Sequence, residues 1–478
     1  MDKKTHCGER QRLTFPVAIN TSARPPSLLP RKLWRTLRLL PLAASMLFLT
    51  AVLAALAVTA LGHTDTDHLA GHTVLQITPS TQEQKSALHE YLDKHPMLDL
   101  WREGLPVEVS VSPEQRQELV RFLDGRGIEH GEVISDLHSL IKNQTLQASL
   151  TLTADDEPLN WKKYYPLEKI YKWMDDLQKN NPDTVRVHTI GKSYEGLDMK
   201  GVVITFAPDQ PVVMLESGIH AREWIAPAAA TYFIDRILNS DENDIVRKFE
   251  WHMFPCVNPD GYVYTWTKNR SWRKTRSTNW LIFKGVDANR NWPFHWQDVG
   301  TNNIVYSEHY AGPHAESEAE TSNLRKYVDI LAPRMRLYLA LHAYGQMLMF
   351  PWSYTKNPTT RHAHLNEIAA KAAEAVKAKN GVTYKYGGIA ETIYIATGSS
   401  IDYVYSKCVP YTYVFEMRPE FSSKDTGEDA GNHGQQGFIL PDDQIEDTAA
   451  EVWAGTLVLL QEVDKYPSGN NPKLCPDL

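Results

Sequence analysis

The sequence predicts an α/β protein whose larger unit is a sheet covered by helices. Three short apolar runs, rich in β-branched and aromatic residues, have the composition of buried strands: Val212–Leu215, Tyr338–Leu341 and Tyr411–Phe415. Long amphipathic stretches alternate with them, at residues 226–239, 316–330, 362–379 and 444–463. This alternation indicates a sandwich around a mixed or parallel sheet, in which the chemistry gathers at the carboxyl ends of central strands.

A smaller α+β unit precedes it, between residues 72 and 144. The predicted strands are Val74–Ile77, Val107–Val111 and Glu132–Ser135, and the predicted helices are Ser80–Leu92, Glu114–Leu123 and Asp136–Lys142. Residues 145–160 are rich in Ser, Thr and acidic side chains without helical periodicity, so we expect a linker there. The larger unit then covers residues 161–478.

Composition supports two hydrophobic cores and excludes one class of partner. The 478 residues are 42% hydrophobic and 10% aromatic, which is enough apolar material for one large core and a smaller one. A formal net charge of −8 and a pI near 6.1 do not provide the basic face that nucleic acid requires. No nucleic-acid partner is therefore expected.

An uncharged apolar run near the N-terminus predicts export from the cytosol. Basic residues between positions 31 and 38 precede the run 39–62, which is long enough to cross a bilayer as a helix. They place residues 1–38 in the cytosol and the rest of the chain outside it. The run is either a type II signal anchor, which would hold the protein at the membrane through residues 39–62, or a long signal peptide whose cleavage would give an extracellular protein.

Cysteine usage is sparse for an exported chain. Cys7 would remain in the cytosol, which leaves Cys256, Cys408 and Cys475 outside. Because three is an odd number, at most one disulfide forms among them.

A candidate zinc site follows two of the predicted strands. His220 and Glu223, in His-Ala-Arg-Glu, come shortly after Val212–Leu215, and His342 comes directly after the run that ends at Leu341. Catalytic zinc takes three protein ligands, usually His and carboxylate, and keeps one position open for water. The motif His-x-x-Glu is weak evidence by itself, because it occurs twice more in this sequence. One copy begins at His6, in the predicted cytosolic leader, and the other begins at His364, where a solvated helix face explains it.

A basic segment lies between the candidate ligands in sequence. The turn-forming Asn258-Pro-Asp-Gly is followed by Asn269–Arg276, which contains Arg273, and by a stretch that contains Asp287, Asn289 and Arg290. Basic residues spaced so closely are usually a solvated loop. Beside a zinc site, however, one guanidinium would stabilise an oxyanion and another would hold a carboxylate through two hydrogen bonds.

These segments together resemble the zinc carboxypeptidases of the pancreatic A/B type, from about residue 72 to residue 463. The motifs HARE, NPDGY, NRSWRKTR, GVDANRNW, LHAYGQ, ETIYIATGSSID and VFEMR occur in the order of that family. The resemblance implies a three-layer α/β/α catalytic domain around a mixed eight-stranded sheet, preceded by a small α+β open-sandwich propeptide that covers the active site. It implies a proenzyme that binds one Zn²⁺ per chain and acts on the C-termini of peptides or proteins.

The resemblance also implies a role for each motif residue. His220, Glu223 and His342 would bind zinc, Asp287 would orient a ligand histidine, Glu416 would be the general base, and Arg273 would polarise the scissile carbonyl. The terminal carboxylate of the substrate would be held by Asn289, Arg290 and Tyr394, and Arg222 and Tyr344 would line neighbouring subsites.

Specificity depends on the base of the pocket that receives the C-terminal side chain. In family terms the position occupied here by Ile401 is acidic in enzymes that prefer Lys or Arg. Ala396, Ile389 and Val414 would add apolar walls, so we expect a preference for aromatic or aliphatic C-terminal residues. Ser399 stands where glycine is common, which would reduce the volume of the pocket.

This sequence departs from the family pattern in its activation region and in one loop. An activating protease is an expected partner, yet Lys142, Lys162 and Lys163 are the only basic candidates near the linker, so the cleavage site is left open. Residues 419–436 form a longer and more polar segment than the usual turn after the general base.

Two other readings of the sequence compete with an active carboxypeptidase. One is a catalytically silent relative that binds peptides, which is disfavoured because the base, the three ligands and Arg273 are all present. The other is a carboxypeptidase of the prohormone-processing type, which is disfavoured because such enzymes lack this propeptide.

Overall fold

The computed structural model describes residues 67–102, 104–151, 158–239, 243–279, 283–298, 303–420 and 437–465. The contact pattern separates residues 1–60 from the rest of the chain, so the features below all belong to the second unit, 61–478. The predicted signal segment, 39–62, lies outside the described residues, as do Cys7, Cys475 and most of 419–436. Among the described residues, no helix combines the length and the apolar character needed to cross a membrane.

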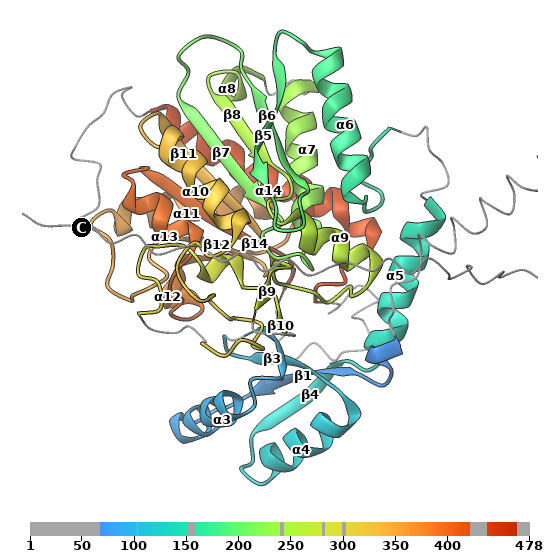
Figure 1. The fold of residues 1–478 in the computed structure, drawn as a ribbon. Helices are drawn as coiled ribbons and strands as arrows, with labels where there is room; N and C mark the ends of the chain where they lie inside the picture. The colour runs from blue at the N-terminus through green and yellow to red at the C-terminus, as the bar shows by residue number, and fades with distance from the viewer. Residues whose placement is uncertain are drawn as a thin grey trace, which may run out of the picture. The chain divides into compact units, whose positions relative to one another are not determined.

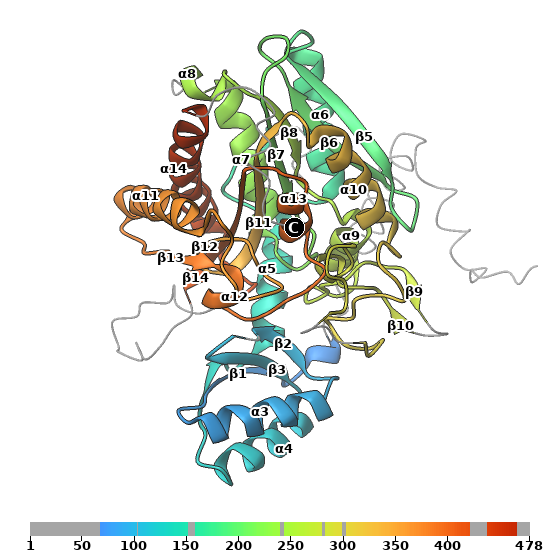
Figure 2. The ribbon, with the colours of Figure 1, turned by 90° about the vertical axis from the view of Figure 1, so that its left-hand side faces the viewer.

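The small unit is a four-stranded antiparallel sheet with two helices on one face (Figure 2). Its strands lie in the order β2 (Asp99–Arg102), β3 (Val107–Val111), β1 (Thr73–Thr78) and β4 (Glu129–Ile134), after a short 3₁₀ helix, η2 (Asp67–Leu69). The helices are α3 (Gln82–Lys94) and α4 (Pro113–Asp124), and each begins with a capping box, Thr81 with Gln84 and Ser112 with Gln115. Leucines and valines from both layers form its separate core.

The segment after β4 differs from the predicted linker. Helix α5 (Leu137–Thr151) continues through Thr145, where irregular chain was expected. Ile141, Gln144 and Ala148 are buried in it at intervals of three and four residues, which is the spacing of one helix face. The helix is therefore stabilised by packing on that face, which the polar composition of the segment does not reveal. Strand β2 was also not predicted.

The large unit is a mixed eight-stranded sheet with helices on both faces (Figures 1 and 2). Its strand order is β13-β12-β14-β11-β7-β8-β6-β5. The bounds are β5 (Val185–Lys192), β6 (Asp198–Ile204), β7 (Val212–Ser217), β8 (Glu250–Phe254), β11 (Met335–Gly345), β12 (Met347–Phe350), β13 (Lys385–Gly388) and β14 (Tyr411–Glu420). The four central strands, β14, β11, β7 and β8, are mutually parallel and almost wholly buried, as a sheet covered on both faces requires.

Figure 2 shows α7, α11 and α14 on one face of this sheet and α10 and α13 on the other. The helices of the unit are α6 (Leu167–Asn180), α7 (Ile225–Asn239), α8 (Asn243–Val246), α9 (Pro259–Thr267), α10 (Ala319–Leu331), α11 (His362–Asn380), α12 (Ile389–Thr392), α13 (Ser400–Ser406) and α14 (Ile445–Asp464). Short elements complete it: β9 (Thr278–Asn279), β10 (Phe283–Lys284), η3 (Ala288–Arg290) and η4 (Asp442–Gln444). The predicted fold class, three layers around a mixed eight-stranded sheet after an open sandwich, is confirmed.

Two local expectations were wrong in ways that matter for the site. The predicted turn at Asn258-Pro-Asp-Gly begins helix α9, because the Asn258 side chain accepts a hydrogen bond from Gly261 N and Pro259 occupies the first helical turn. Strand β11 extends past Leu341 to Gly345, so His342 lies within the strand.

Cys256 is buried and free, whereas Cys408 is disulfide-bonded.

Candidate active site

Three buried side chains converge where the central strands end. His220 and Glu223 lie between β7 and α7, and His342 lies on β11, the neighbouring strand. One ligand atom from each lies within 4.8 Å of the others. His220 Nδ1 is 2.7 Å from Glu223 Oε1, and His342 Nδ1 is 3.1 Å from Glu223 Oε2 and 3.2 Å from His220 Nδ1. Among the described residues this is the only group of three or more His, Cys, Asp or Glu side chains so arranged.

The donor set fits a zinc ion. His220 Nε2 donates to Asp287 Oδ1 across 3.1 Å, which leaves a lone pair on Nδ1 of the neutral ring. Burial, together with the charge of Arg273, lowers the pKa of His220 and keeps the ring in this neutral form. That lone pair faces a carboxylate oxygen of Glu223, and two lone pairs repel unless a cation lies between them. Two imidazoles and one carboxylate are also the ligands of many catalytic zinc sites.

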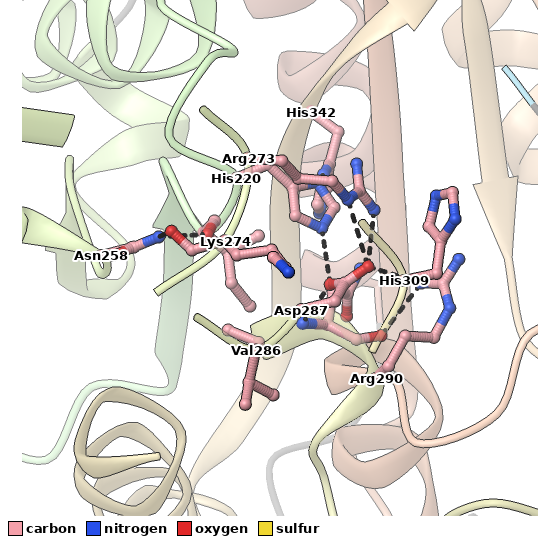
Figure 3. Close-up of polar contacts among 12 residues, drawn as sticks. His220, Asn258, Arg273, Lys274, Val286, Asp287, Arg290, His309 and His342 are labelled. Carbon is pink, nitrogen blue, oxygen red and sulfur yellow. Dashed lines mark hydrogen bonds and ion pairs between the residues drawn. The ribbon is translucent and has the colours of Figure 1, made fainter. Parts of the chain in front are cut away.

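Asp287 connects the ligand histidine to a guanidinium. Its Oδ2 accepts hydrogen bonds from Arg273 Nε at 3.1 Å and Nη2 at 2.9 Å, while its Oδ1 faces His220 (Figure 3). Burial alone would raise the pKa of Asp287, but Arg273 and His220 hold it well below its ordinary range, so it remains a carboxylate. Arg273 Nη1 lies 3.9 Å from Glu223 Oε1, beside the candidate ligands. This arrangement holds the Arg273 charge next to the metal position.

Glu416 faces the same site from β14. It pairs in register with His342 of β11, so the strand pairing alone brings the two side chains to one place. Burial raises the pKa of Glu416 to about 8; the His342 imidazole opposes this shift and the Glu223 carboxylate reinforces it. A carboxyl group in such surroundings is suited to accept and return a proton near neutral pH.

A second guanidinium, that of Arg290 on the short helix η3, lines the same pocket. Arg290 Nη2 donates to Tyr394 Oη at 3.0 Å, and Nη1 donates to Asn289 O at 3.1 Å. Asn289 Oδ1 accepts from Ser400 N at 3.0 Å, which leaves its Nδ2 as the donor for a ligand. Arg290 is only 4% exposed.

These groups border one open cleft of about 890 Å³. Apolar side chains line much of it: Ala340, Met347, Met349, Ile389, Ile393, Ala396, Ile401 and Val414. Three serines, Ser353, Ser399 and Ser400, also line it, as does His309. Of these, Ser353 and His309 carry no sequence signal, because each lies in an irregular segment that only folding brings to the cleft.

The small unit reaches into this cleft. Trp101, Arg102 and Gly104 line it together with the candidate catalytic side chains. Arg222 Nη1 donates to Asp99 Oδ1 at 2.8 Å and Nη2 donates to Leu100 O at 3.1 Å.

The two units are also joined on either side of that contact. The Tyr344 hydroxyl donates a hydrogen bond to the carboxylate of Glu108 on β3. On α5, Gln144 accepts from Arg270 Nε at 2.8 Å and donates to Leu440 O at 3.0 Å. Arg270 is fully buried and stacks on Trp224, a role that the sequence did not suggest. Arg222 and Tyr344, which were predicted to line substrate subsites, therefore both donate hydrogen bonds to the small unit.

The two other His-x-x-Glu spellings form no comparable site in the described residues. His364 lies on α11 with its Nε2 3.3 Å from Tyr411 Oη, and Glu367 is paired with Lys371 at 2.9 Å. His6 lies outside the described residues.

Fold and site together define a zinc peptidase of the α/β/α class whose cleft is covered by an N-terminal unit. The family model for zinc carboxypeptidase matches residues 170–455, and the model for the carboxypeptidase activation peptide matches residues 75–144. The chain therefore belongs to the zinc carboxypeptidase family. It is a metallocarboxypeptidase that carries an activation peptide, and its cofactor is zinc.

Individual relatives agree with this assignment. The chain is 35% identical to zinc carboxypeptidase A 1 of Anopheles gambiae over 399 residues, which is 82% of this chain and 89% of the relative. It is 34% identical to carboxypeptidase A1 of Bos taurus over 426 residues, 86% of this chain and 97% of the relative. The crystal structure of carboxypeptidase A from Helicoverpa armigera superposes with a TM-score of 0.77 at 27% identity, covering 85% of this chain and all of that one.

Proposed function

We propose that this enzyme removes aromatic or aliphatic residues from the C-termini of peptides and proteins once the small unit has been cleaved from it. The observation that carries this proposal is the arrangement of the cleft. Apolar residues that include Ile401 and Val414 line the same cleft as Arg290 and Tyr394, which can hold a free carboxylate. The described lining of this cleft contains no acidic side chain except Glu223 and Glu416, so the charge of a Lys or Arg side chain would find no carboxylate among the pocket residues to pair with.

Each polar group then has one task in the reaction. Zinc, when held by His220, Glu223 and His342, supplies Lewis-acid activation of a water molecule. Glu416 accepts a proton from the attacking water and delivers it to the departing amine. Arg273, fixed by Asp287, presents its charge to the oxygen of the scissile carbonyl, where negative charge develops.

Exopeptidase action follows from the group around Arg290. A substrate carboxylate accepts hydrogen bonds from Arg290, from Asn289 Nδ2 and from the Tyr394 hydroxyl. A chain that continues past the scissile bond places no charge there, so it would forgo the charged hydrogen bonds with this guanidinium. We expect the C-terminal peptide bond to be the one cleaved for this reason.

The competing proposal is a catalytically silent protein that binds peptides in this cleft. The position of Glu416 beside His342, and of Arg273 beside Glu223, supports the enzyme instead, because a binding protein has no need of a base or an oxyanion donor there.

The proposals on export and activation rest on the sequence. Residues 39–62 are proposed to direct the chain into the secretory pathway, either to be cleaved or to act as an anchor. The activating protease is proposed to cut between the units, near residues 145–160. N-terminal sequencing of protein secreted by cultured cells, before and after activation, would test both.

The central test is hydrolysis of blocked dipeptides that end in Phe, Leu, Lys or Glu by the full chain after limited proteolysis. We expect release of Phe and Leu that a zinc chelator abolishes, that added zinc restores, and that the Glu416→Gln variant lacks. Zinc bound at one ion per chain without turnover of any substrate would favour the silent peptide-binding protein.

A further inference from the structure

Besides its apolar residues, the cleft lining includes a group of serines. Ser353, Ser399 and Ser400 all border the cleft, and each is at most 3% exposed. Ser353 lies in the loop after β12, whereas Ser399 is the N-cap residue of α13 and Ser400 begins that helix. Two separate segments therefore bring hydroxyl groups together at one point.

The hydroxyl protons at this point are all used inside the protein. Ser353 Oγ donates to Asp402 Oδ2 at 2.6 Å. Since this hydroxyl has one proton, the 2.7 Å contact between Ser353 Oγ and Ser399 Oγ must be donated by Ser399. Ser400 Oγ donates to Glu216 Oε1 at 2.5 Å.

Asp402 fixes the direction of this chain of hydrogen bonds. Its carboxylate also accepts from the backbone N–H groups of Ser353, at 2.9 Å, and Tyr354, at 2.9 Å. Burial raises the pKa of Asp402 to about 6, so at pH 7.5 it is ionised and can only accept. Both serine hydroxyls therefore point their protons toward Asp402. Ser399 Oγ also accepts from the Asp402 backbone N–H at 3.4 Å, and Ser353 Oγ accepts from Ser399, so each oxygen keeps one lone pair for a ligand.

We infer that the Ser353–Ser399 hydroxyl pair makes the base of the pocket a hydrogen-bond acceptor, which selects C-terminal side chains that carry a neutral donor at the tip. This inference rests on the proposed function, because it assigns the substrate class within the same pocket. We therefore expect Tyr to be favoured over Phe, Gln over Met and Asn over Leu as the C-terminal residue. Asp and Glu are rejected, because a carboxylate can only accept and would face both the serine lone pairs and the Asp402 charge.

The expected discrimination is moderate. A lone pair left without a donor costs less than an unpaired N–H or O–H, and the serine protons stay satisfied whichever residue is bound. A neutral hydrogen bond changes the ratio of kcat/KM by about 3- to 10-fold. The Tyr and Phe pair is the cleanest comparison, because the hydroxyl of Tyr adds one donor at the end of an otherwise identical ring.

Three variants separate this effect from pocket volume. Ser353→Ala combined with Ser399→Ala removes both acceptors, and we expect the Tyr/Phe and Gln/Met ratios of kcat/KM to fall to about 1. Ser399→Ala alone keeps Ser353 as an acceptor and keeps part of the preference. Ser406→Ala is the matched control, because Ser406 lies on the same helix, is not part of the cleft lining and donates its hydroxyl proton to Tyr403 O; we expect it to retain the wild-type ratios.

A binding measurement separates this inference from the proposed function. Calorimetric titration of zinc-loaded Glu416→Gln protein, after limited proteolysis, with free tyrosine and free phenylalanine requires no turnover. Tyrosine binding at least 3-fold tighter, with the difference lost in the double serine variant, supports the inference even if no peptide is hydrolysed. Equal binding of the two amino acids, or a preference that persists when both serines are alanine and melting curves show the variant to be folded, would overturn it.

Discussion

The requirement for a free C-terminal carboxylate can be tested through Arg290. This guanidinium is almost fully buried, and Tyr394 and the Asn289 carbonyl take one hydrogen bond each. Arg290 Nη1 also lies 4.0 Å from Asp287 Oδ2, which accepts from Arg273. A substrate carboxylate would add a negative charge directly to this guanidinium.

The size of the effect follows from the cost of breaking a buried charged pair. Removal of one partner of such a pair costs about 3 to 5 kcal/mol. Converted at about 1.4 kcal/mol per tenfold change, this predicts a loss of kcat/KM of roughly 10²- to 4 × 10³-fold for Arg290→Met. The same loss is expected when the wild-type enzyme is given a substrate whose C-terminus is an amide, because the substrate then lacks the negative charge that pairs with Arg290.

The assay is a double-mutant cycle with two enzymes and two substrates. Wild type and Arg290→Met are compared on one peptide with a free or an amidated C-terminus, and kcat and KM are measured separately. Arg290→Met should no longer distinguish the two substrates. Arg247→Met, at an exposed position, is the matched control and should behave as wild type. A wild-type enzyme that cleaves the amide within 3-fold of the free acid would refute the reasoning.

Three further perturbations follow from contacts around the site and the core. Asp287→Asn should weaken zinc affinity about 10- to 100-fold in competition with a chromogenic chelator, because it removes the charge that orients His220; unchanged affinity would contradict that role. Asp99→Asn should raise the activity of the uncleaved chain several-fold, since its bond to Arg222 helps to hold the small unit over the cleft, and Asp93→Asn, on an exposed helix face, should not. Glu320→Gln should stabilise the protein by about 2 to 3 kcal/mol at pH 8.5 and much less at pH 5, as followed by thermal melting; an equal effect at both values would be inconsistent. The sign follows because burial raises the pKa of Glu320 to about 7, so its folded-state ionisation costs stability as pH rises through that value.

Local sequence patterns predicted much of the fold. The continuous apolar run Val212–Leu215 and the amphipathic stretch from residue 362 to 379 are clear signals, and the structure places β7 and α11 there within two residues. The candidate zinc ligands were predicted because His220, Glu223 and His342 come after such runs in the sequence. Their convergence is a consequence of parallel pairing, which aligns the carboxyl ends of β7 and β11.

The missed features depend on contacts between distant segments. Residues 145–151 are helical because Gln144 and Ala148 pack against the rest of the protein, and no property of that stretch alone predicts this. Asn258 was predicted to form a turn because its side chain can cap either a turn or a helix, and both use the same hydrogen bond.

The sequence by itself therefore determined the class of the protein, the identity of the candidate ligands and the apolar character expected of the pocket. Those properties depend on residue types at short spacing, which are visible in the sequence as local periodicity and as the order of the motifs. Only the tertiary structure decided that Ser353 meets Ser399, that Arg222 is taken by Asp99, and that the hydroxyl protons at the pocket base point inward. Each of these depends on the distance and direction between atoms of remote segments, which are set when the sheet and its covering loops pack together.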